Sequence, residues 1–231
     1  GPLVEIIERI GGGLYDAGRW DTLASWIDAL PEAKLTAHPG LLVHRGMINM
    51  ERGAYEQALV LADRASALYG LQGDKRRQAY ALMVKGHVYR FRGQYRQAIE
   101  LSDEVLALVG DRPGEASPAA ALAHKTAGLC WLRLGKSARA EEELVRALRI
   151  HEDLDAPYEV AMLHHDLGFS REMVGDLRGA AGYYEAALQW WQQTERPGPW
   201  ANTLNSLGVI YYFEGQYEKA RQTLDEALSK A

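Results

Sequence analysis

The chain has 231 residues with a formal net charge of −5 at pH 7; 47% of the residues are hydrophobic and 25% are charged. This composition is that of a folded protein and excludes long disorder and collagen-like repeats. No apolar run approaches the roughly 18 to 20 residues of a membrane-spanning helix, and an acidic chain without a basic run is not expected to bind nucleic acid. The single cysteine, Cys130, cannot form an internal disulfide, so we expect a cytoplasmic protein.

Six glycines recur along the chain at a nearly constant spacing. They begin the triplets at Gly18, Gly53, Gly93, Gly135, Gly175 and Gly215. Their separations are 35, 40, 42, 40 and 40 residues, and a fixed period between about 20 and 50 residues is typical of stacked supersecondary units. The sequence therefore predicts one solenoid domain over residues 1–231, with six repeats at 3–38, 39–73, 74–115, 117–155, 157–197 and 199–231.

Local signals place helices within these repeats. In the first repeat, the triplet Gly11–Gly13 is improbable inside a helix and fits the pattern poorly. Asp74 is expected to cap the first helix of the third repeat, and Ser117 followed by Pro118 that of the fourth, because these residue types favour helix starts.

The last repeat shows the pattern of a helical hairpin. Pro199 is expected in the first turn, and the first apolar stripe comprises Leu204, Leu207, Gly208 and Tyr211 at i, i+3, i+4 and i+7. The second stripe, after Gly215, comprises Tyr217, Ala220, Leu224, Ala227 and Leu228. Glycine suits the left-handed position that ends a helix, and small residues such as Gly168 and Gly208 let two helices approach closely. The sequence thus predicts an all-α fold of six helical hairpins.

The segment from Gly110 to Pro118 is the nearest candidate for a linker between two separate domains. It is rich in Gly, Pro and polar residues, as such linkers are. It also falls where a junction between repeats is due. We therefore predict one continuous solenoid.

The last repeat resembles the tetratricopeptide repeat in the residues Leu207-Gly208, Tyr211, Gly215-Gln216-Tyr217 and Ala220. The resemblance covers nearly the whole chain and implies a right-handed superhelical solenoid. The repeats are longer than the usual length of about 34 residues. Longer hairpins imply a deeper groove on the concave side.

Two subfamilies with long repeats are similar to parts of this chain. The opening segment looks like the sensor region of MalT-like, LuxR-type, ATP-dependent transcription activators. The residues that carry this resemblance are Leu23 through Trp26-Ile27-Asp28-Ala29-Leu30-Pro31, then Leu35, His38-Pro39 and an expected helix from Leu41 to Glu51. That resemblance implies a fragment of a larger regulator that recognises a small-molecule, peptide or protein effector in its concave groove. The alternative is an interaction adaptor of the kinesin-light-chain or peptide-pheromone-receptor type, suggested by residues 201–207, which binds an extended peptide.

No cluster of residues predicts catalysis or a cofactor. Gly135-Lys136-Ser137 imitates the end of a phosphate-binding loop, but Cys130 stands where that loop needs its first glycine. His164 and His165 are consecutive helical residues that point about 100° apart, so they cannot share a metal ion. Cys130 has no evident base partner and is expected to be buried. We therefore expect a protein that is not an enzyme and holds no cofactor.

A second stripe on the first helices predicts a ligand-binding surface. It lies about 130° from the core stripe and so cannot face the hairpin partner, and it is too apolar to be merely solvated. Part of it packs on the adjacent hairpin; for the rest, the family resemblance implies a place in the concave groove. The candidate residues are His87, Arg90, Phe91, Lys125, His165, Phe169, Glu172, Asn202, Asn205 and Tyr212. The amides of Asn202 and Asn205 match a peptide bond or a sugar hydroxyl.

These candidates also have purely structural interpretations. Arg90 or Arg133 could pair with Glu172, and His165 could be a partly buried polar residue. His124 and His164 lie on the core stripe and are expected to be packed. The tryptophans near the fifth junction, expected in the core or at an interface, are Trp190, Trp191 and Trp200.

The final helix, expected over residues 218–231, predicts an association surface. It presents Leu224, Ala227 and Leu228 without a following polar helix. The ends of solenoids normally need such a covering helix. We therefore expect that the chain could form a homodimer through this end.

Overall fold

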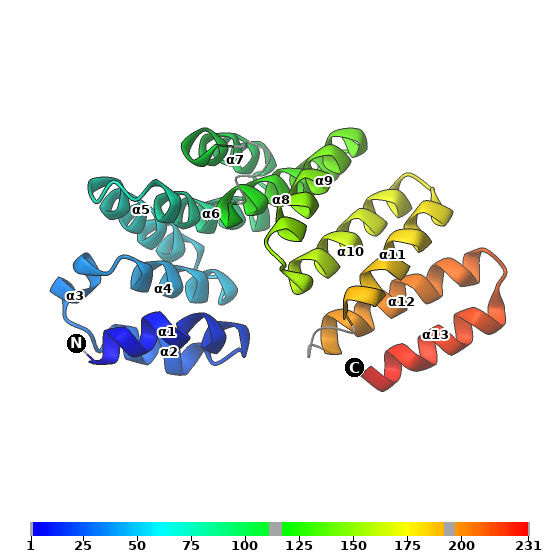
Figure 1. The fold of residues 1–231 in the computed structure, drawn as a ribbon, viewed down its shortest axis with the longest axis horizontal. Helices are drawn as coiled ribbons and strands as arrows, with labels where there is room; N and C mark the ends of the chain where they lie inside the picture. Colours follow the sequence, from blue (N-terminus) through cyan, green and yellow to red (C-terminus); the bar gives the residue numbers. More distant parts are fainter. Residues whose placement is uncertain (1, 111–116, 192–196, 231) are drawn as a thin grey trace. The chain divides into compact units, whose positions relative to one another are not determined.

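A computed structural model describes residues 2–110, 117–191 and 197–230. In these residues it contains thirteen α-helices and no strand, which confirms the all-α prediction (Figure 1). The contacts divide the chain into two compact units, Gly1–Asp111 and Arg112–Ala231. The division falls inside the candidate linker, of which residues 111–116 lie outside the described residues. The single continuous solenoid therefore stays a prediction.

The first unit contains three helical hairpins and one short extra helix. Its helices are α1 (Pro2–Asp16), α2 (Trp20–Asp28), α3 (Glu32–Ala37), α4 (Gly40–Glu51), α5 (Tyr55–Leu71), α6 (Lys75–Phe91) and α7 (Tyr95–Val109). The hairpins are α1 with α2, α4 with α5, and α6 with α7 (Figure 1). Helix α4 also packs on α1 and α2, and α6 packs on α4 and α5, so successive hairpins stack within this unit.

The second unit contains the other three hairpins. Its helices are α8 (Pro118–Arg133), α9 (Ser137–Asp153), α10 (Pro157–Met173), α11 (Leu177–Trp191), α12 (Pro197–Phe213) and α13 (Tyr217–Lys230). Here α9 packs on α10 and α11 packs on α12, which joins consecutive hairpins. Because α12 begins at Pro197, Pro199 is its third residue and lies in the first turn, as predicted. Proline is tolerated there because the first turn has no intrahelical acceptor for its N–H groups.

The turns and caps are those that the sequence predicts. All six recurrent glycines have a positive φ, for example +71° at Gly135 and +81° at Gly175, so each ends its helix in the left-handed conformation. The Asp74 side chain accepts a hydrogen bond from the backbone N–H of Arg77 at 3.0 Å. Ser117 caps α8 in the same way through Ala120, at 3.4 Å.

Close packing explains the small residues inside the hairpins. A Cβ at Gly168 would lie 2.6 Å from the Tyr184 ring, and one at Gly208 would lie 2.7 Å from Leu224. Gly11–Gly13, which fits a helix poorly by propensity, nevertheless lies within α1. Gly11 is buried, and a Cβ there would lie 3.2 Å from the Nε2 atom of His44. Contact between α1 and α4 thus outweighs the propensity cost, which is at most about 1 kcal/mol per glycine.

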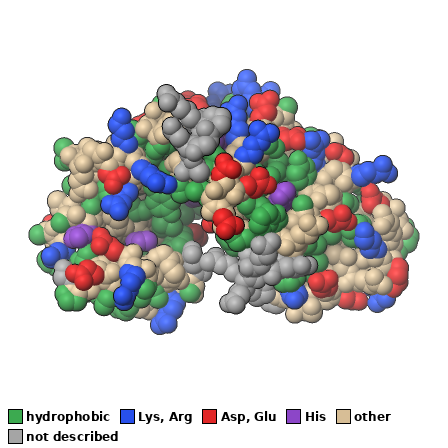
Figure 2. Space-filling model, viewed as in Figure 1, with side chains coloured by type: hydrophobic (Ala, Val, Ile, Leu, Met, Phe, Trp, Pro, Cys, Tyr) green, Lys and Arg blue, Asp and Glu red, His purple; other side chains and the backbone are tan. Residues whose placement is uncertain are grey.

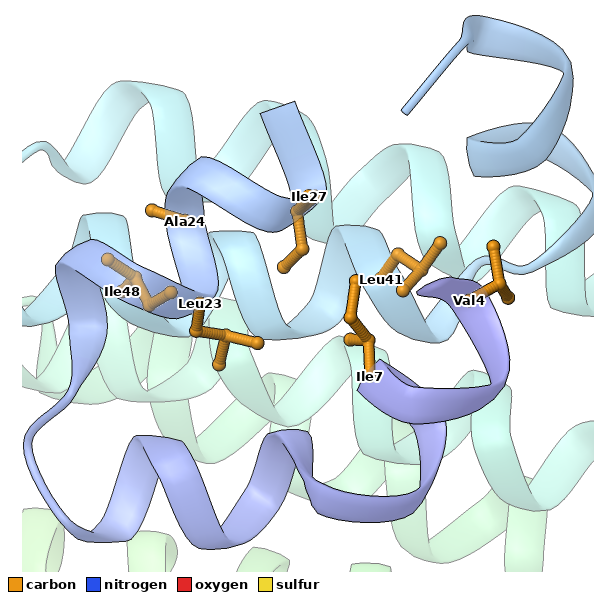
Figure 3. Packing of buried hydrophobic residues seen from close by; sticks show 7 residues of the cluster. All are labelled: Val4, Ile7, Leu23, Ala24, Ile27, Leu41 and Ile48. Carbon is orange, nitrogen blue, oxygen red and sulfur yellow. The ribbon is translucent and has the colours of Figure 1, made fainter. Parts of the chain in front are cut away.

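The opening segment folds around its own apolar core. Side chains from α1, α2 and α4 point toward one another there: Val4, Ile7, Leu23, Ala24, Ile27, Leu41 and Ile48 (Figure 3). Trp26, Leu30 and Leu35 are partly buried against this cluster. The residues that carry the resemblance to MalT-like regulators therefore form one packed structure with α4.

Polar contacts also join consecutive hairpins. Arg45 on α4 donates to both carboxylate oxygens of Asp28 on α2, at 2.9 and 3.1 Å. The contact recurs between later hairpins, with Lys85 donating to Asp63, Arg171 to Glu141 and Tyr211 to Glu185. Exposed ion pairs contribute only about 0 to 1 kcal/mol each, so the buried apolar clusters contribute most of the stability.

Two surface properties bear on possible partners. Across the described part of the chain, no helix is both long and apolar enough to pass through a lipid bilayer. On the face shown in Figure 2, basic and acidic side chains are interspersed.

Candidate functional site

Among the helices that carry the predicted binding stripe, α12 has the stripe residues whose side chains are most exposed. Asn202 and Asn205 are both exposed, and in the described residues neither side chain makes a hydrogen bond. Farther along the helix, Tyr212 and Phe213 are 59% and 68% exposed. These four residues, with half-buried Val209 between them, are called the α12 surface below.

Aromatic rings gather at one end of the α12 surface. The Tyr212 ring meets the rings of Phe213 and Tyr217 edge to face, with centroid distances of 5.8 and 5.5 Å. Tyr217 was placed in the core stripe by its spacing, but it is 65% exposed. It lies at the first position of α13, before the helix has turned its core side toward α12. The helical spacing of the apolar residues therefore could not predict that Tyr217 belongs to this aromatic cluster.

His165 connects two helices and is only partly accessible. Its Nδ1 atom lies 3.0 Å from the Thr203 hydroxyl, and its ring centroid lies 5.2 Å from that of Tyr184. The Thr203 hydroxyl donates to the carbonyl of Pro199, so the hydrogen-bond network assigns the donated proton to Nδ1 of His165. The indole N–H of Trp191 donates to the same hydroxyl at 3.0 Å. His165 is thus a partly buried polar residue, in agreement with the structural alternative to ligand binding.

Burial lowers the pKa of His165. The negative charges of Asp166 and Glu172 oppose this shift, whereas the positive charge of Lys125 adds to it. His165 is therefore neutral at pH 7. A neutral imidazole suits its place between α10 and α12, where a charge would be poorly solvated.

Glu172 and Lys125 also contact neighbouring helices. The Tyr184 hydroxyl donates to Glu172 at 2.8 Å, and no ion pair joins Glu172 to Arg133 within the described part of the chain. The Lys125 ammonium lies 3.3 Å from Asp166, and the two side chains are only 22% and 15% exposed. Both candidates thus have structural partners inside the second unit.

The remaining candidates lie on α6 and α10. The Arg90 guanidinium stacks on the ring of Phe91, 4.3 Å from its centroid, and Phe91 is 50% exposed. His87, one turn before Arg90, is half-buried. These three residues form a small cationic and aromatic surface on the first unit. Phe169 is half-buried on α10, on the same side as His165 and Glu172.

Several predictions about packing are confirmed. Cys130 is a buried cysteine, and buried His124 contacts Glu143 through Nδ1 at 2.6 Å. His164 is half-buried beside the ring of Tyr183. Trp191 is fully buried, and Trp190 and Trp200 pack against its cluster.

In the described residues, no group of three or more His, Cys, Asp or Glu side chains could hold a metal ion.

The apolar surface expected on the final helix is much smaller than predicted. Leu224 packs beneath Gly208 of the same hairpin, and Ala227 is only 7% exposed. Leu228 alone of the three predicted residues is largely exposed, at 78%. The hairpin partner α12 covers the rest, so the argument for a dimer at this end reduces to Leu228.

Cavities that the sequence did not indicate lie among the described residues of the first unit. One, of about 440 Å³, lies between α2, α4 and α5 beside Arg45 and Val60. Another, of about 470 Å³, surrounds the hydroxyl end of Tyr69. Their lining residues come from separate helices, so no local spacing could have grouped them.

The paired helices, the left-handed turn glycines and the Leu-Gly pattern are similar to those of tetratricopeptide repeats. Family models described as tetratricopeptide repeat match residues 81–116 and 159–231. No curated protein matches the chain in sequence.

Solved structures share the fold. BtubC (BKLC) from P. vanneervenii is 21% identical, with a TM-score of 0.74 over 94% of this chain and 89% of that chain. A Rap protein complexed with competence and sporulation factor is 19% identical, with a TM-score of 0.75 over 91% of this chain and 58% of that one. Repeats of a putative kinesin light chain from Podosopora anserina are 15% identical, with a TM-score of 0.66 over 85% of this chain and 95% of theirs. At these identities the similarity establishes the fold alone.

Proposed function

We propose that the chain is a non-catalytic interaction module that binds an extended segment of a partner polypeptide on the α12 surface. The observation that carries this proposal is the pair Asn202 and Asn205. Both side chains are exposed, one turn apart, and their amides make no hydrogen bond in the described residues. The exposed rings of Tyr212 and Phe213 follow on the same helix.

The chemistry of the α12 surface suits a polypeptide backbone. Each asparagine amide offers a donor and an acceptor, which match the C=O and N–H groups of a peptide unit. Residues three apart on a helix are separated by about 5 to 6 Å, close to the rise of about 6.6 Å over two residues of an extended chain. The two amides can therefore bind alternate peptide units, while the aromatic rings contact apolar side chains.

Two solved structures of this fold bear on the proposal. A Rap protein of this fold is complexed with competence and sporulation factor, and a putative kinesin light chain has such repeats. The preference for a peptide over a sugar comes from the spacing of the asparagines and from the aromatic rings.

The proposal is tested by peptide selection followed by affinity measurement. Peptides of about twelve residues selected on the full chain are expected to lose about tenfold or more in affinity for the Asn202→Ala/Asn205→Ala variant, because hydrogen bonds contribute about 0.5 to 1.5 kcal/mol each. Gln189→Ala, which removes an exposed amide from α11, is the control and should leave the affinity unchanged. Equal affinity for the wild type and the double variant would reject the proposal.

A second proposal is that the chain is the sensor part of a MalT-like, LuxR-type regulator. Its support is the opening segment, in which Trp26, Leu30 and Leu35 pack on the core shared by α1, α2 and α4. On this proposal, the bound partner is the effector that regulates an ATPase and a DNA-binding part. The gene sequence upstream of the Leu3 codon should then encode a nucleotide-binding domain, and a different upstream domain would eliminate this proposal.

A further inference from the structure

The first unit contains a polar cavity of about 470 Å³ that is separate from the α12 surface. Residues of α1, α4, α5 and α6 and of the loop before α4 line it, among them Glu8, His38, Gly40, His44, Tyr69 and Arg77. Its volume lies within the range of about 300 to 1,000 Å³ that is typical of small-molecule sites. None of the candidate residues on α6 lines it.

Tyr69 provides the main evidence for a ligand. The residue is only 6% exposed, yet its hydroxyl makes no hydrogen bond with any of the described residues. The hydroxyl oxygen lies 3.0 Å from the position of a Cβ on Gly40, so it reaches the first residue of α4. The ring is packed in the fold, whereas the hydroxyl oxygen is open to the cavity, where water or a ligand can reach it. The fold does not use this polar group, whereas a ligand in the cavity can.

The cavity offers positive and negative groups at the same time. The Arg77 side chain is 71% exposed, and its guanidinium lies 3.5 Å from the Asp74 carboxylate in the same turn. The start of α4, a twelve-residue helix, adds the positive end of its dipole. On the negative side, one carboxylate oxygen of Glu8 contacts Nδ1 of His38 at 2.8 Å, and the side chain remains 49% exposed.

We propose that this cavity binds a zwitterion of the amino-acid class. Its carboxylate would meet Arg77, the Tyr69 hydroxyl and the start of α4, and its ammonium group would meet Glu8. A simple anion would leave Glu8 with His38 alone, and a simple cation would leave Arg77 with Asp74 alone. A zwitterion satisfies both groups in one cavity.

The test is calorimetric titration of the full chain with each of the twenty standard amino acids. We expect saturable binding of at least one of them with one site per chain. The corresponding acid without the amino group, and the amine without the carboxylate, should each bind at least tenfold more weakly. Failure of all twenty to bind, or equal affinity for the acid without its amino group, would overturn the proposal.

Substitutions locate the site. Tyr69→Phe and Arg77→Ala should each weaken binding about tenfold, whereas Arg76→Ala, at an exposed neighbouring arginine, should not. Gly40→Ala should also weaken it, because the new methyl group would press on the Tyr69 hydroxyl. Gly12→Ala is the matched control, since a Cβ there meets nothing within 4 Å.

Circular dichroism verifies that each variant is folded before titration. Folded Tyr69→Phe and Arg77→Ala proteins that bind the amino acid as well as the wild type would place the ligand elsewhere and refute this site. The inference is independent of the proposed function, because the peptide experiment concerns only the α12 surface of the second unit. Failure of either experiment leaves the other unaffected.

Discussion

His165, Glu172 and Lys125 occupy positions that helical periodicity assigns to the binding stripe, and each contacts a neighbouring helix. Their partners, Thr203, Tyr184 and Asp166, lie 38, 12 and 41 residues away along the chain. Helical spacing tells which side of its own helix a residue occupies, but not which side chain the next helix brings opposite it. By contrast, the positions of Asn202 and Asn205 along α12 are enough to place both side chains on its exposed side.

Gly168 is a position at which a single methyl group should destabilise the fold. The new Cβ of Gly168→Ala would lie 2.6 Å from the Tyr184 ring. Overpacking costs about 1 to 3 kcal/mol and outweighs the gain in helix propensity of up to about 1 kcal/mol. We expect a net loss of about 1 to 2 kcal/mol in the free energy of unfolding, measured by urea denaturation.

The control for this substitution is Gly182→Ala on α11. A Cβ there meets nothing within 4 Å, so only the propensity gain remains and stability should rise. If Gly168→Ala were as stable as Gly182→Ala, the packing explanation for the small residues would be wrong.

His151 should make the stability of the second unit depend on pH. Burial, and then the nearby charge of Lys125, lower the pKa of His151 from 6.5 to about 4. Its Nδ1 atom is buried and has no hydrogen-bond partner in the described residues. As the pH falls below 6.5, the unfolded chain binds a proton at His151 before the folded protein does. The folded protein therefore keeps its full stability above pH 6.5 and loses stability as the pH falls toward 4. We expect a loss of about 2 kcal/mol between pH 7 and pH 5.

Urea denaturation of the wild type and of His151→Gln at both pH values isolates this effect. The variant has no titrating ring at this position and should lose less stability on acidification. The same loss in both proteins would show that other groups cause the pH dependence.

The helices themselves follow closely from the sequence. The glycine spacing predicts every hairpin, and the left-handed conformation of the turn glycines agrees with it. Helix α3 and the helical state of Gly11–Gly13 were missed. The reason is that tertiary contact with α4, and not local propensity, stabilises α1 at the triplet.

The cap of α6 gives a prediction for a single element. Asp74 accepts from the N–H of Arg77 at 3.0 Å, so Asp74→Ala should lower the free energy of unfolding by about 1 kcal/mol. Asp74→Asn keeps a capping oxygen and should lose much less. Equal losses for the two variants, measured by thermal or urea unfolding, would exclude the cap as the cause.

For the whole molecule, the repeat pattern could be predicted from the sequence, but the polar cavity around Tyr69 could not. The repeat appears in the sequence because each copy encodes the same hairpin. The cavity arises where helices of three successive hairpins meet around Tyr69. Each of its residues looks ordinary within its own helix, so only the stacked structure brings these charges together.

The central claim is that a partner polypeptide lies on the α12 surface. Nuclear magnetic resonance of the full chain, with and without a selected peptide, tests it through the side-chain amide signals of Asn202 and Asn205. We predict that both amide signals shift on saturation, while the buried indole N–H signal of Trp191 remains in place. Unchanged asparagine signals, with shifts confined to α13 or to the first unit, would contradict the claim.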